Sequence, residues 1–231
     1  METLYNGFSL DIAPGTFPLS TDSIALADFV RLPRQAGVLD LGSGCGTLGV
    51  LLCAKDESCS VTGVELDANA HTKALENCSI NRLEGRLCSI HADLKAVPDF
   101  LPPGSFDICV SNPPYFTTGK LSRTTPQARH ALSCSLEQLM HSAAWALKFG
   151  GDFYLVHKPE RLAEIFVACA PEKLEPKRLC LIRHRADGPV ALVLLQLRKG
   201  GKPGLVWEDI VLRNPDGSPS ADYKRIYHQQ A

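Results

Sequence analysis

The sequence predicts an α/β fold built on one Rossmann-like, doubly wound sheet of seven mostly parallel strands. Short apolar runs alternate along the chain with segments of helical apolar spacing. The runs are apolar at consecutive positions, which is typical of strands that helices cover on both faces. A glycine-rich turn joins the first run to a helix. The 231 residues, 45% hydrophobic and 21% charged, suffice for a full core and exclude disordered, collagen-like and coiled-coil proteins.

The elements follow in a regular order. A helix is expected first, over residues 21–30, where an aspartate near the start precedes apolar residues at helical spacing. Apolar runs then predict five strands, at residues 38–41, 61–66, 86–91, 106–111 and 152–157. Helical spacing predicts the helices between and after them, at residues 47–55, 68–80, 136–147 and 160–169. Residues 180–185 and 189–199 form two apolar runs without an intervening helix, so we expect an antiparallel C-terminal hairpin.

The chain carries no internal repeat and no long linker, so we expect a single domain over residues 1–231. Residues 1–35 would form a short N-terminal extension with the leading helix, residues 36–200 the core, and residues 201–231 a tail. No apolar run has the length of a membrane span, and the first residues lack the regions of a signal peptide. We therefore expect a cytoplasmic protein that binds no membrane, and we favour a monomer.

Nine cysteines are scattered through apolar stretches, such as those around Cys53 and Cys109, and no pair has C-x-x-C spacing. This pattern is typical of buried, reduced thiols in the cytosol. The histidines are too scattered for a metal site, so no metal is expected. His141 and His157 are interpreted as structural residues.

The formal net charge of −1 hides an asymmetry between the two halves of the chain. Residues 1–115 hold 7 Lys/Arg and 14 Asp/Glu, whereas residues 116–231 hold 17 and 11. Such an asymmetry is typical of a face that binds a polyanion. A chance difference between solvated surfaces explains it equally well at this stage.

The glycine-rich turn runs from Asp40 to Gly49 and follows the first predicted strand. Closely spaced glycines let a backbone approach a ligand that a Cβ would exclude. Glu65 ends the second predicted strand, where its carboxylate can accept both hydroxyls of a ribose. Gly44 and the glycines after it also satisfy G-x-G-x-x-G, which fits a dinucleotide. The charge of Asp40 would repel a pyrophosphate, however, and favours a ligand that carries an ammonium group.

Asn112, Pro113, Pro114 and Tyr115 follow the fourth predicted strand. Two prolines can simply end a strand, but ligands of open α/β sheets bind at the carboxyl ends of strands. The glycine loop and this tetrapeptide would then border one cleft. The side-chain oxygen of Asn112 and the carbonyl of Pro113 can each accept one hydrogen of an exocyclic amino group. Tyr115 and Phe116 offer faces on which a planar base can stack.

The segment from Asp40 to Gly46 resembles the first motif of class I S-adenosylmethionine-dependent methyltransferases, and Glu65 matches their ribose-binding acid. Asn-Pro-Pro-Tyr resembles the motif of members that methylate an amide or exocyclic amino nitrogen. The resemblance implies S-adenosyl-L-methionine as cofactor and Asn112, Pro113, Pro114 and Tyr115 as catalytic residues. The implied cofactor-binding residues are Thr21, Asp40, Gly42, Gly44, Gly46, Glu65, Asp93 and Asn112. For Asp93, a helix N-cap is the alternative role.

A longer resemblance covers nearly the whole chain. It is similar to the bacterial family that methylates N6 of the adenine beside the anticodon in a valine tRNA. The similarity lies in residues 15–22, 126–129, 207–217 and 220–223. It implies tRNA as the partner. Other amino or amide targets stay open, namely a guanine N2 in rRNA, an adenine in DNA or a glutamine in a protein, as does a non-catalytic RNA-binding module.

The charge of the second half is compatible with RNA. Residues 116–202 hold 14 Lys/Arg and 7 Asp/Glu. Lys120, Arg123 and Arg129 follow the tetrapeptide on an expected loop, and with Tyr115 and Phe116 they are the candidate substrate-binding residues. For each cation, a solvated surface position is an equally good explanation.

Overall fold

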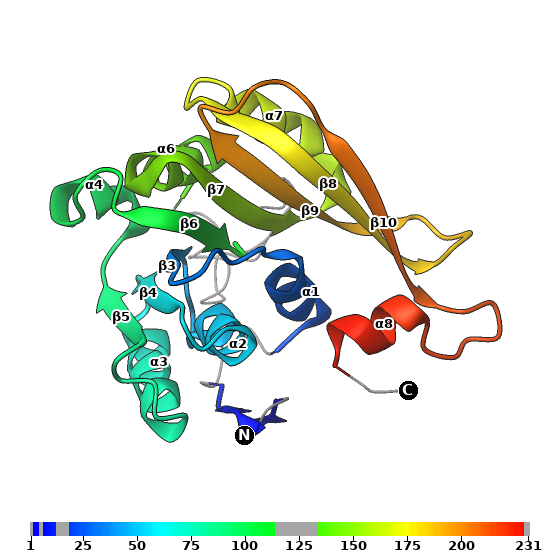
Figure 1. Cartoon of the computed structure of the whole chain (residues 1–231), viewed down its shortest axis with the longest axis horizontal. Coiled ribbons are helices and arrows are strands. Elements are labelled where there is room, and N and C mark those ends of the chain that lie inside the picture. Colours follow the sequence, from blue (N-terminus) through cyan, green and yellow to red (C-terminus); the bar gives the residue numbers. More distant parts are fainter. Residues whose placement is uncertain (1, 5–6, 13–18, 114–133, 229–231) are drawn as a thin grey trace, which may run out of the picture.

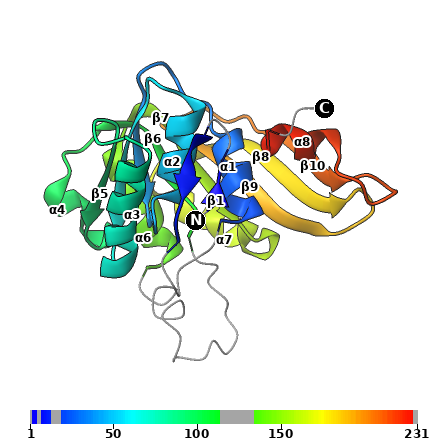
Figure 2. The ribbon, with the colours of Figure 1, turned by 90° about the horizontal axis from the view of Figure 1, so that it is seen from below.

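The computed structural model describes residues 2–4, 7–12, 19–113 and 134–228. Its centre is a mixed eight-stranded sheet of order β10-β8-β9-β7-β6-β3-β4-β5, with helices on both faces (Figure 1). A separate two-stranded sheet pairs β1 (Glu2–Thr3) with β2 (Ser9–Leu10). Figure 2 shows β8, β9, β10 and α8 gathered at the end of the molecule opposite to α3 and α4.

The parallel strands β3 to β7 are neighbours in the sheet, from β7 in its middle to the edge strand β5. Their bounds are β3 (Gly37–Leu41), β4 (Ser60–Glu65), β5 (Leu87–His91), β6 (Phe106–Ser111) and β7 (Leu147–His157). The strand β9 (Val190–Lys199) is antiparallel to β7 and to β8 (Leu174–Arg185), and β10 (Val206–Arg213) is parallel to β8. The helices are α1 (Thr21–Phe29), α2 (Thr47–Lys55), α3 (Ala68–Ile80), α4 (Val97–Phe100), α6 (Leu136–Ala146), α7 (Leu162–Cys169) and α8 (Ala221–Ile226), with 3-10 turns η2 (Leu94–Ala96) and η3 (Pro159–Arg161).

The order of strands and helices and the antiparallel hairpin are confirmed. The count of seven strands was wrong, because residues 206–213 form an eighth strand, β10, instead of part of a tail. Ile210 and Leu212 of β10 are buried while the residues between and beside them are less covered, as expected for a strand at the edge of a sheet. In addition, β7 begins at Leu147, five residues before the predicted start, and α7 is preceded by a 3-10 turn.

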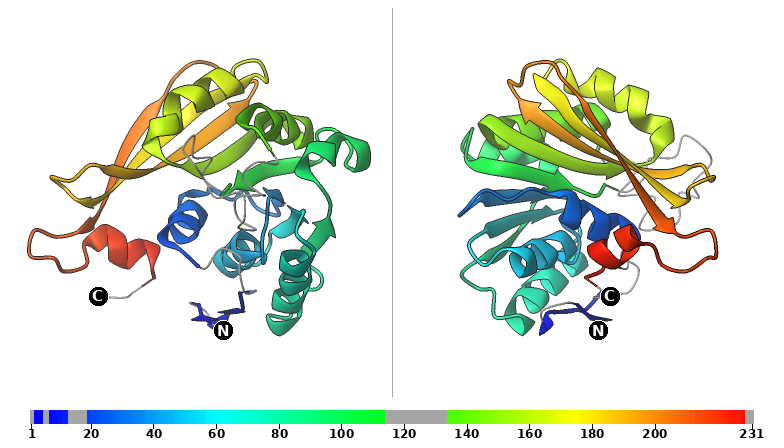
Figure 3. Two further views of the ribbon diagram at one scale, coloured as in Figure 1. Left: turned by 180° about the vertical axis from the view of Figure 1, so that it is seen from behind. Right: turned by 45° about the vertical axis from the view of Figure 1, so that its right-hand side comes forward.

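Two apolar layers enclose the sheet. Helices α1, α2 and α3 cover one face, where Val38 and Val110 are buried, and α6 and α7 cover the other, where Leu39 and Cys109 are buried (Figure 3). Since side chains alternate along a strand, Asp40 at two positions after Val38 lies on the face of α1 and α2. The same alternation places Asn112, two positions after Val110, on that face.

The nine cysteines all lie in the described part of the chain and form no disulfide. Seven of them are buried, as expected, whereas Cys88 is exposed and Cys134 is half-buried. Within the same residues, no helix combines the length and apolar character that a membrane span requires.

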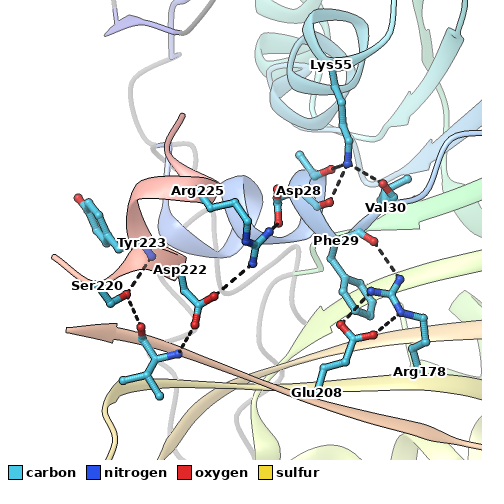
Figure 4. A network of polar contacts seen from close by, with 12 residues as sticks. Asp28, Phe29, Val30, Lys55, Arg178, Glu208, Ser220, Asp222, Tyr223 and Arg225 are labelled. Atoms are coloured by element: carbon cyan, nitrogen blue, oxygen red, sulfur yellow. Dashed lines mark hydrogen bonds and ion pairs between the residues drawn. The ribbon is translucent and has the colours of Figure 1, made fainter. Parts of the chain in front are cut away.

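The guanidinium of Arg178 fastens the C-terminal strand to helix α1 (Figure 4). It donates to both carboxylate oxygens of Glu208 on β10, over 2.7 and 3.0 Å, and to the carbonyl of Phe29 over 3.2 Å. It also lies over the Phe29 ring, 3.9 Å from the centroid. These bonds hold the pKa of the Glu208 carboxyl below its usual range. The pair therefore links β8, β10 and the end of α1.

The ammonium of Lys55, at the end of α2, satisfies the carbonyls at the C-terminus of α1. It donates to the carbonyls of Ala27, Asp28 and Val30 over 2.9, 2.7 and 2.6 Å (Figure 4). The Asp28 side chain pairs with Arg225 of α8. A cation at a helix C-terminus also interacts favourably with the helix dipole. The position of α1 is thus set by α2, by β8 and by the C-terminal segment.

We expect Glu208→Ala to lower the free energy of unfolding by about 2–3 kcal/mol, because it leaves the buried guanidinium of Arg178 without its counter-charge. The matched control is Asp209→Ala on the same strand, whose carboxylate is exposed and lies 3.8 Å from Arg183. Asp209→Ala should lower the free energy of unfolding by no more than about 0.5 kcal/mol. Urea unfolding of both variants measures the difference, and equal losses would contradict this role of Arg178.

Candidate active site

Two neighbouring strands bring the candidate residues to one edge of the sheet. Strand β3 pairs directly with β6, with Asp40 opposite Val110, so the glycine loop and Asn112 leave the sheet side by side. The hydroxyl of Ser111 donates to the carbonyl of Leu41 over 2.7 Å and ties the two strand ends together. The two strand ends are therefore neighbours, as the prediction of a shared cleft requires, and the cleft itself stays a prediction.

The glycine loop turns tightly over the end of β4. Gly42 and Gly44 have φ values of +75° and +55°, which favour glycine, and a Cβ at either position would meet no atom within 4 Å. The N–H groups of Gly42 and Ser43 both donate to the carbonyl of Val64, over 2.9 and 3.1 Å. Gly46, also at positive φ, packs beside Ala74 of α3. The backbone of the loop is therefore fixed while the space beside Gly42 and Gly44 is open to a ligand.

The carboxylate of Glu65 joins this loop to the next one. One oxygen accepts the N–H of Gly44 and the other the N–H of Asp67, each over 2.7 Å. Asp67 in turn caps α3 by accepting from the N–H of Ala70 over 2.8 Å. Each oxygen of a carboxylate has a second acceptor position. Glu65 can therefore hold the loop and accept ligand hydroxyls at once.

Asn77, on α3, supports the glycine loop through hydrogen bonds and was not among the predicted residues. Its side chain is fully buried on α3. The amide nitrogen donates to the carbonyl of Cys45 over 2.9 Å and to that of Asp11 over 2.8 Å, while its oxygen accepts the N–H of Asp11. A polar residue at the apolar spacing of Ala70 and Ala74 is the signal that could have identified it.

Asp40 is the unusual group of the site. It is 1% exposed, and neither carboxylate oxygen has a hydrogen-bond partner among the residues that the structure describes. The buried hydroxyl of Ser43, in the loop itself, shares this property. Burial, with the nearby charge of Glu65, raises the pKa of Asp40 to about 8. A buried, unpaired carboxylate beside an open backbone fits a ligand that brings a cationic donor.

Asn112 is held by the first helix. Its amide nitrogen donates to the hydroxyl of Ser23 on α1 over 3.0 Å, and Ser23 is buried. The described residues make no hydrogen bond to the amide oxygen, which stays available as an acceptor. Pro113 is buried beside it. Ser23 was not predicted as a site residue, and only its place directly after Thr21 and Asp22 pointed to it.

The other candidate residues have different positions. Thr21 shares a hydrogen bond of 2.7 Å with the hydroxyl of Tyr227, so its side chain contacts the C-terminal segment. Asp93 caps η2 by accepting the N–H of Lys95 over 3.0 Å, which is its alternative role; cofactor binding by Asp93 stays a prediction. Pro114, Tyr115, Phe116, Lys120, Arg123 and Arg129 lie outside the described residues.

The two histidines have surroundings that fit structural roles. Burial lowers the pKa of His157 to about 4, so its ring is neutral at physiological pH. His141 lies 3.1 Å from Glu172 at the surface. In the described ranges, no cluster of histidine, cysteine or carboxylate side chains could hold a metal ion.

Comparison with protein families gives one clear match. The family described as "Methyltransferase small domain" matches residues 20–170. The chain is also 28% identical to the tRNA1(Val) (adenine(37)-N6)-methyltransferase of Vibrio parahaemolyticus, with 97% of this chain and 93% of the relative covered. The enzyme of the same name from Dickeya chrysanthemi is 29% identical, over 90% and 85% of the two chains.

Solved structures share the fold. A protein from Agrobacterium tumefaciens described as a predicted O-methyltransferase has a TM-score of 0.75 at 22% identity, covering 90% of this chain and 96% of its own. Geranyl diphosphate C-methyltransferase from Streptomyces coelicolor, in complex with Mg²⁺, geranyl diphosphate and S-adenosyl-L-homocysteine, has a TM-score of 0.57 at 15% identity, over 76% and 78% of the chains. At these identities the likeness concerns the fold.

The raised pKa of Asp40 predicts a pH dependence of stability. The carboxyl has its ordinary pKa in the unfolded chain and a pKa of about 8 in the folded protein, so the folded state retains the proton longer. The stability of the ligand-free protein should therefore fall as pH rises from about 4 to about 8, by at most about 1.4 kcal/mol per pH unit from this group. Asp40→Asn should remove that contribution. Urea unfolding between pH 5 and 8 measures this. The free energy of unfolding of the variant should increase relative to that of the wild type as pH rises. A constant difference would show that Asp40 is not the group responsible.

Proposed function

The chain belongs to the methyltransferase small domain family, and we propose that it transfers a methyl group from S-adenosyl-L-methionine to the N6 amino group of an adenine in tRNA. One observation carries this proposal: Asn112 lies one strand away from the buried carboxyl of Asp40, and within the described residues neither the amide oxygen of Asn112 nor the carboxyl has a hydrogen-bond partner. The relatives named above supply the substrate class, because their similarity extends over nearly the whole chain.

The residues of the glycine loop fit the cofactor. Asp40 would accept the ammonium of its methionine part, and the open backbone at Gly42 and Gly44 would lie against it, with Gly46 closing the loop. Glu65 would accept the ribose hydroxyls. Thr21 and Asp93 are further candidates at the same edge. When bound, S-adenosyl-L-methionine supplies a methyl carbon that the adjacent positive sulfur has already activated.

Asn112 and Pro113 would orient the nitrogen that receives the methyl group. The lone pair of an exocyclic amino group is delocalised into its ring, which makes the nitrogen a weak nucleophile. The oxygen of Asn112 and the carbonyl of Pro113 would each accept one amino hydrogen, so that the lone pair is directed away from both. Ser23 keeps the amide in the required orientation through its hydrogen bond. Such positioning and electrostatic stabilisation can supply most of the rate enhancement.

The remaining assignments concern the RNA. An adenine stacked in an RNA loop must be extruded before Asn112 can reach its amino group, at a cost of a few kcal/mol. We propose that Tyr115 and Phe116, with Pro114 before them, recover part of that cost by stacking, and that Lys120, Arg123 and Arg129 contact phosphates. We also propose that one domain, acting as a monomer in the cytoplasm, carries out this reaction.

Unmodified total tRNA incubated with labelled cofactor tests the substrate. We expect label in the RNA and N6-methyladenosine after nucleoside mass analysis. In a parallel reaction with a cell extract as the acceptor, treatment of the extract with RNase should remove all acceptor activity. Label that survives RNase and follows protein would instead indicate a glutamine amide as the target, and the absence of cofactor binding would leave a non-catalytic RNA-binding protein.

Asn112→Ala should lower kcat by about 10²–10³-fold, because an oriented hydrogen-bond acceptor is lost from the reacting nitrogen. Cofactor affinity should change less than about 3-fold, since Asn112 is only one of the candidate cofactor contacts and the loop and Glu65 are untouched; calorimetry measures it. Ser23→Ala should lower kcat by about 10-fold and leave cofactor affinity unchanged, as expected for a residue that positions Asn112. Unchanged turnover in Asn112→Ala would exclude the proposed mechanism.

A further inference from the structure

A pocket opens at the edge of the sheet where the glycine loop and Asn112 lie, beside the first turn of α1. It has a volume of about 510 Å³, within the usual range for ligand sites. Thr21, Asp22 and Ile24 line it from α1, and Lys158 lines it from the end of β7. The remaining lining residues are Ile182 and His184 of β8, Ala191 and Leu192 of β9, Leu212 of β10, Tyr227 after α8, and Glu2, Leu19 and Ser20 from the N-terminal part of the chain.

The first turn of α1 separates this pocket from the methyl-transfer site. Ser23 holds Asn112, while Asp22 and Ile24, its two neighbours, line the pocket. Lys158 directly follows β7, the strand that pairs with β6. A ligand in the pocket would therefore lie next to the group that Asn112 orients.

The pocket has the chemistry of a nucleobase site. Its apolar part is formed by Ile24, Ile182, Leu192 and Leu212. Its polar part includes Lys158, Asp22 and His184. A base has two apolar faces and a polar edge, so it fits such a lining. The lining carries two carboxylates, Glu2 and Asp22, against the ammonium of Lys158 and the imidazole of His184. The positive charge of Lys158 lowers the pKa of Asp22, which burial raises. Since the cations do not outnumber the carboxylates, the lining favours a neutral, planar group over a phosphate.

Stacked planar groups lead from the pocket to the surface. The ring of Tyr227 stacks on Tyr223, with centroids 4.2 Å apart and an interplanar angle of 16°. The exposed guanidinium of Arg213 lies 5.3 Å from the centroid of Tyr223. Tyr227 is fixed at the pocket wall by its hydrogen bond to Thr21. Aromatic rings and guanidinium planes are the usual partners of unstacked RNA bases.

We propose that this pocket receives the nucleobase that neighbours the target adenine in the RNA. The inference rests on the proposed function, since it needs an RNA whose target base is extruded. Extrusion separates the target from its neighbour and exposes a face of that neighbour. The pocket on the other side of the α1 turn supplies a new contact for it, and so contributes to the choice of RNA.

The test uses anticodon-loop RNAs in which the nucleotide on either side of the target adenine is made abasic, one at a time. For the wild-type protein, one of the two changes should lower kcat/KM by about 10-fold or more, the range of a lost base stack. Ala191→Trp, which fills the pocket, should cause a similar loss on the intact RNA and little further loss on the abasic one. Ala170→Trp, an exposed change after α7 on the other face of the sheet, should behave as wild type.

Two further measurements guard against a general defect. His184→Ala, a truncation at an exposed lining residue, should give a smaller loss with the same dependence on the abasic site. Cofactor affinity and thermal unfolding of each variant should match the wild type. Equal rates on intact and abasic RNAs, or losses that simply add, would overturn the pocket assignment while the proposed function stands. Methyl transfer to none of the RNAs would overturn both.

Discussion

The buried carboxylate of Asp40 is the constraint around which the site is arranged. A buried carboxyl that finds no partner in the described part of the chain lowers the stability of the ligand-free protein as it ionises, and a carboxamide of the same shape would avoid that cost of ionisation. The surrounding contacts hold it in place nevertheless: Glu65 fixes the loop beyond it, and Asn77 fixes the same loop from α3. This combination of a rigid frame and a buried carboxyl that has no hydrogen-bond partner among the described residues is typical of a site that a ligand completes.

Much of the fold follows from local patterns. Buried parallel strands carry apolar residues on both of their faces, and this made β3, β4 and β6 recognisable within one residue of their bounds. Strand β10 was missed because it is a partly exposed edge strand, in which Glu208 and Asp209 interrupt the apolar pattern. Its place in the sheet depends on pairing with β8 and on the Arg178 pair, which are contacts between residues distant in sequence.

The site was predictable where one segment carries the chemistry. The glycine loop, Glu65 and Asn112 are recognised from residue types at strand ends, and the pairing of β3 with β6 places them together. Ser23 and Asn77 escaped notice because their roles consist of hydrogen bonds to residues 89 and 32 positions away. Single residue types such as serine and asparagine do not reveal such bonds. Asp93 was identified from the sequence, but its role stayed ambiguous, since an aspartate at this position fits both a helix cap and a ligand contact.

The contacts that hold α1 in place have a consequence for the synthesis of the protein. The helix that holds Asn112 is itself held by Arg178, by Arg225 and by Tyr227, all of which are translated long after it. A nascent chain that has reached residue 170 already contains the glycine loop and the tetrapeptide, but its first helix still lacks these anchors. Maturation of the catalytic edge on the ribosome therefore waits for β8, β10 and α8 to emerge from the exit tunnel.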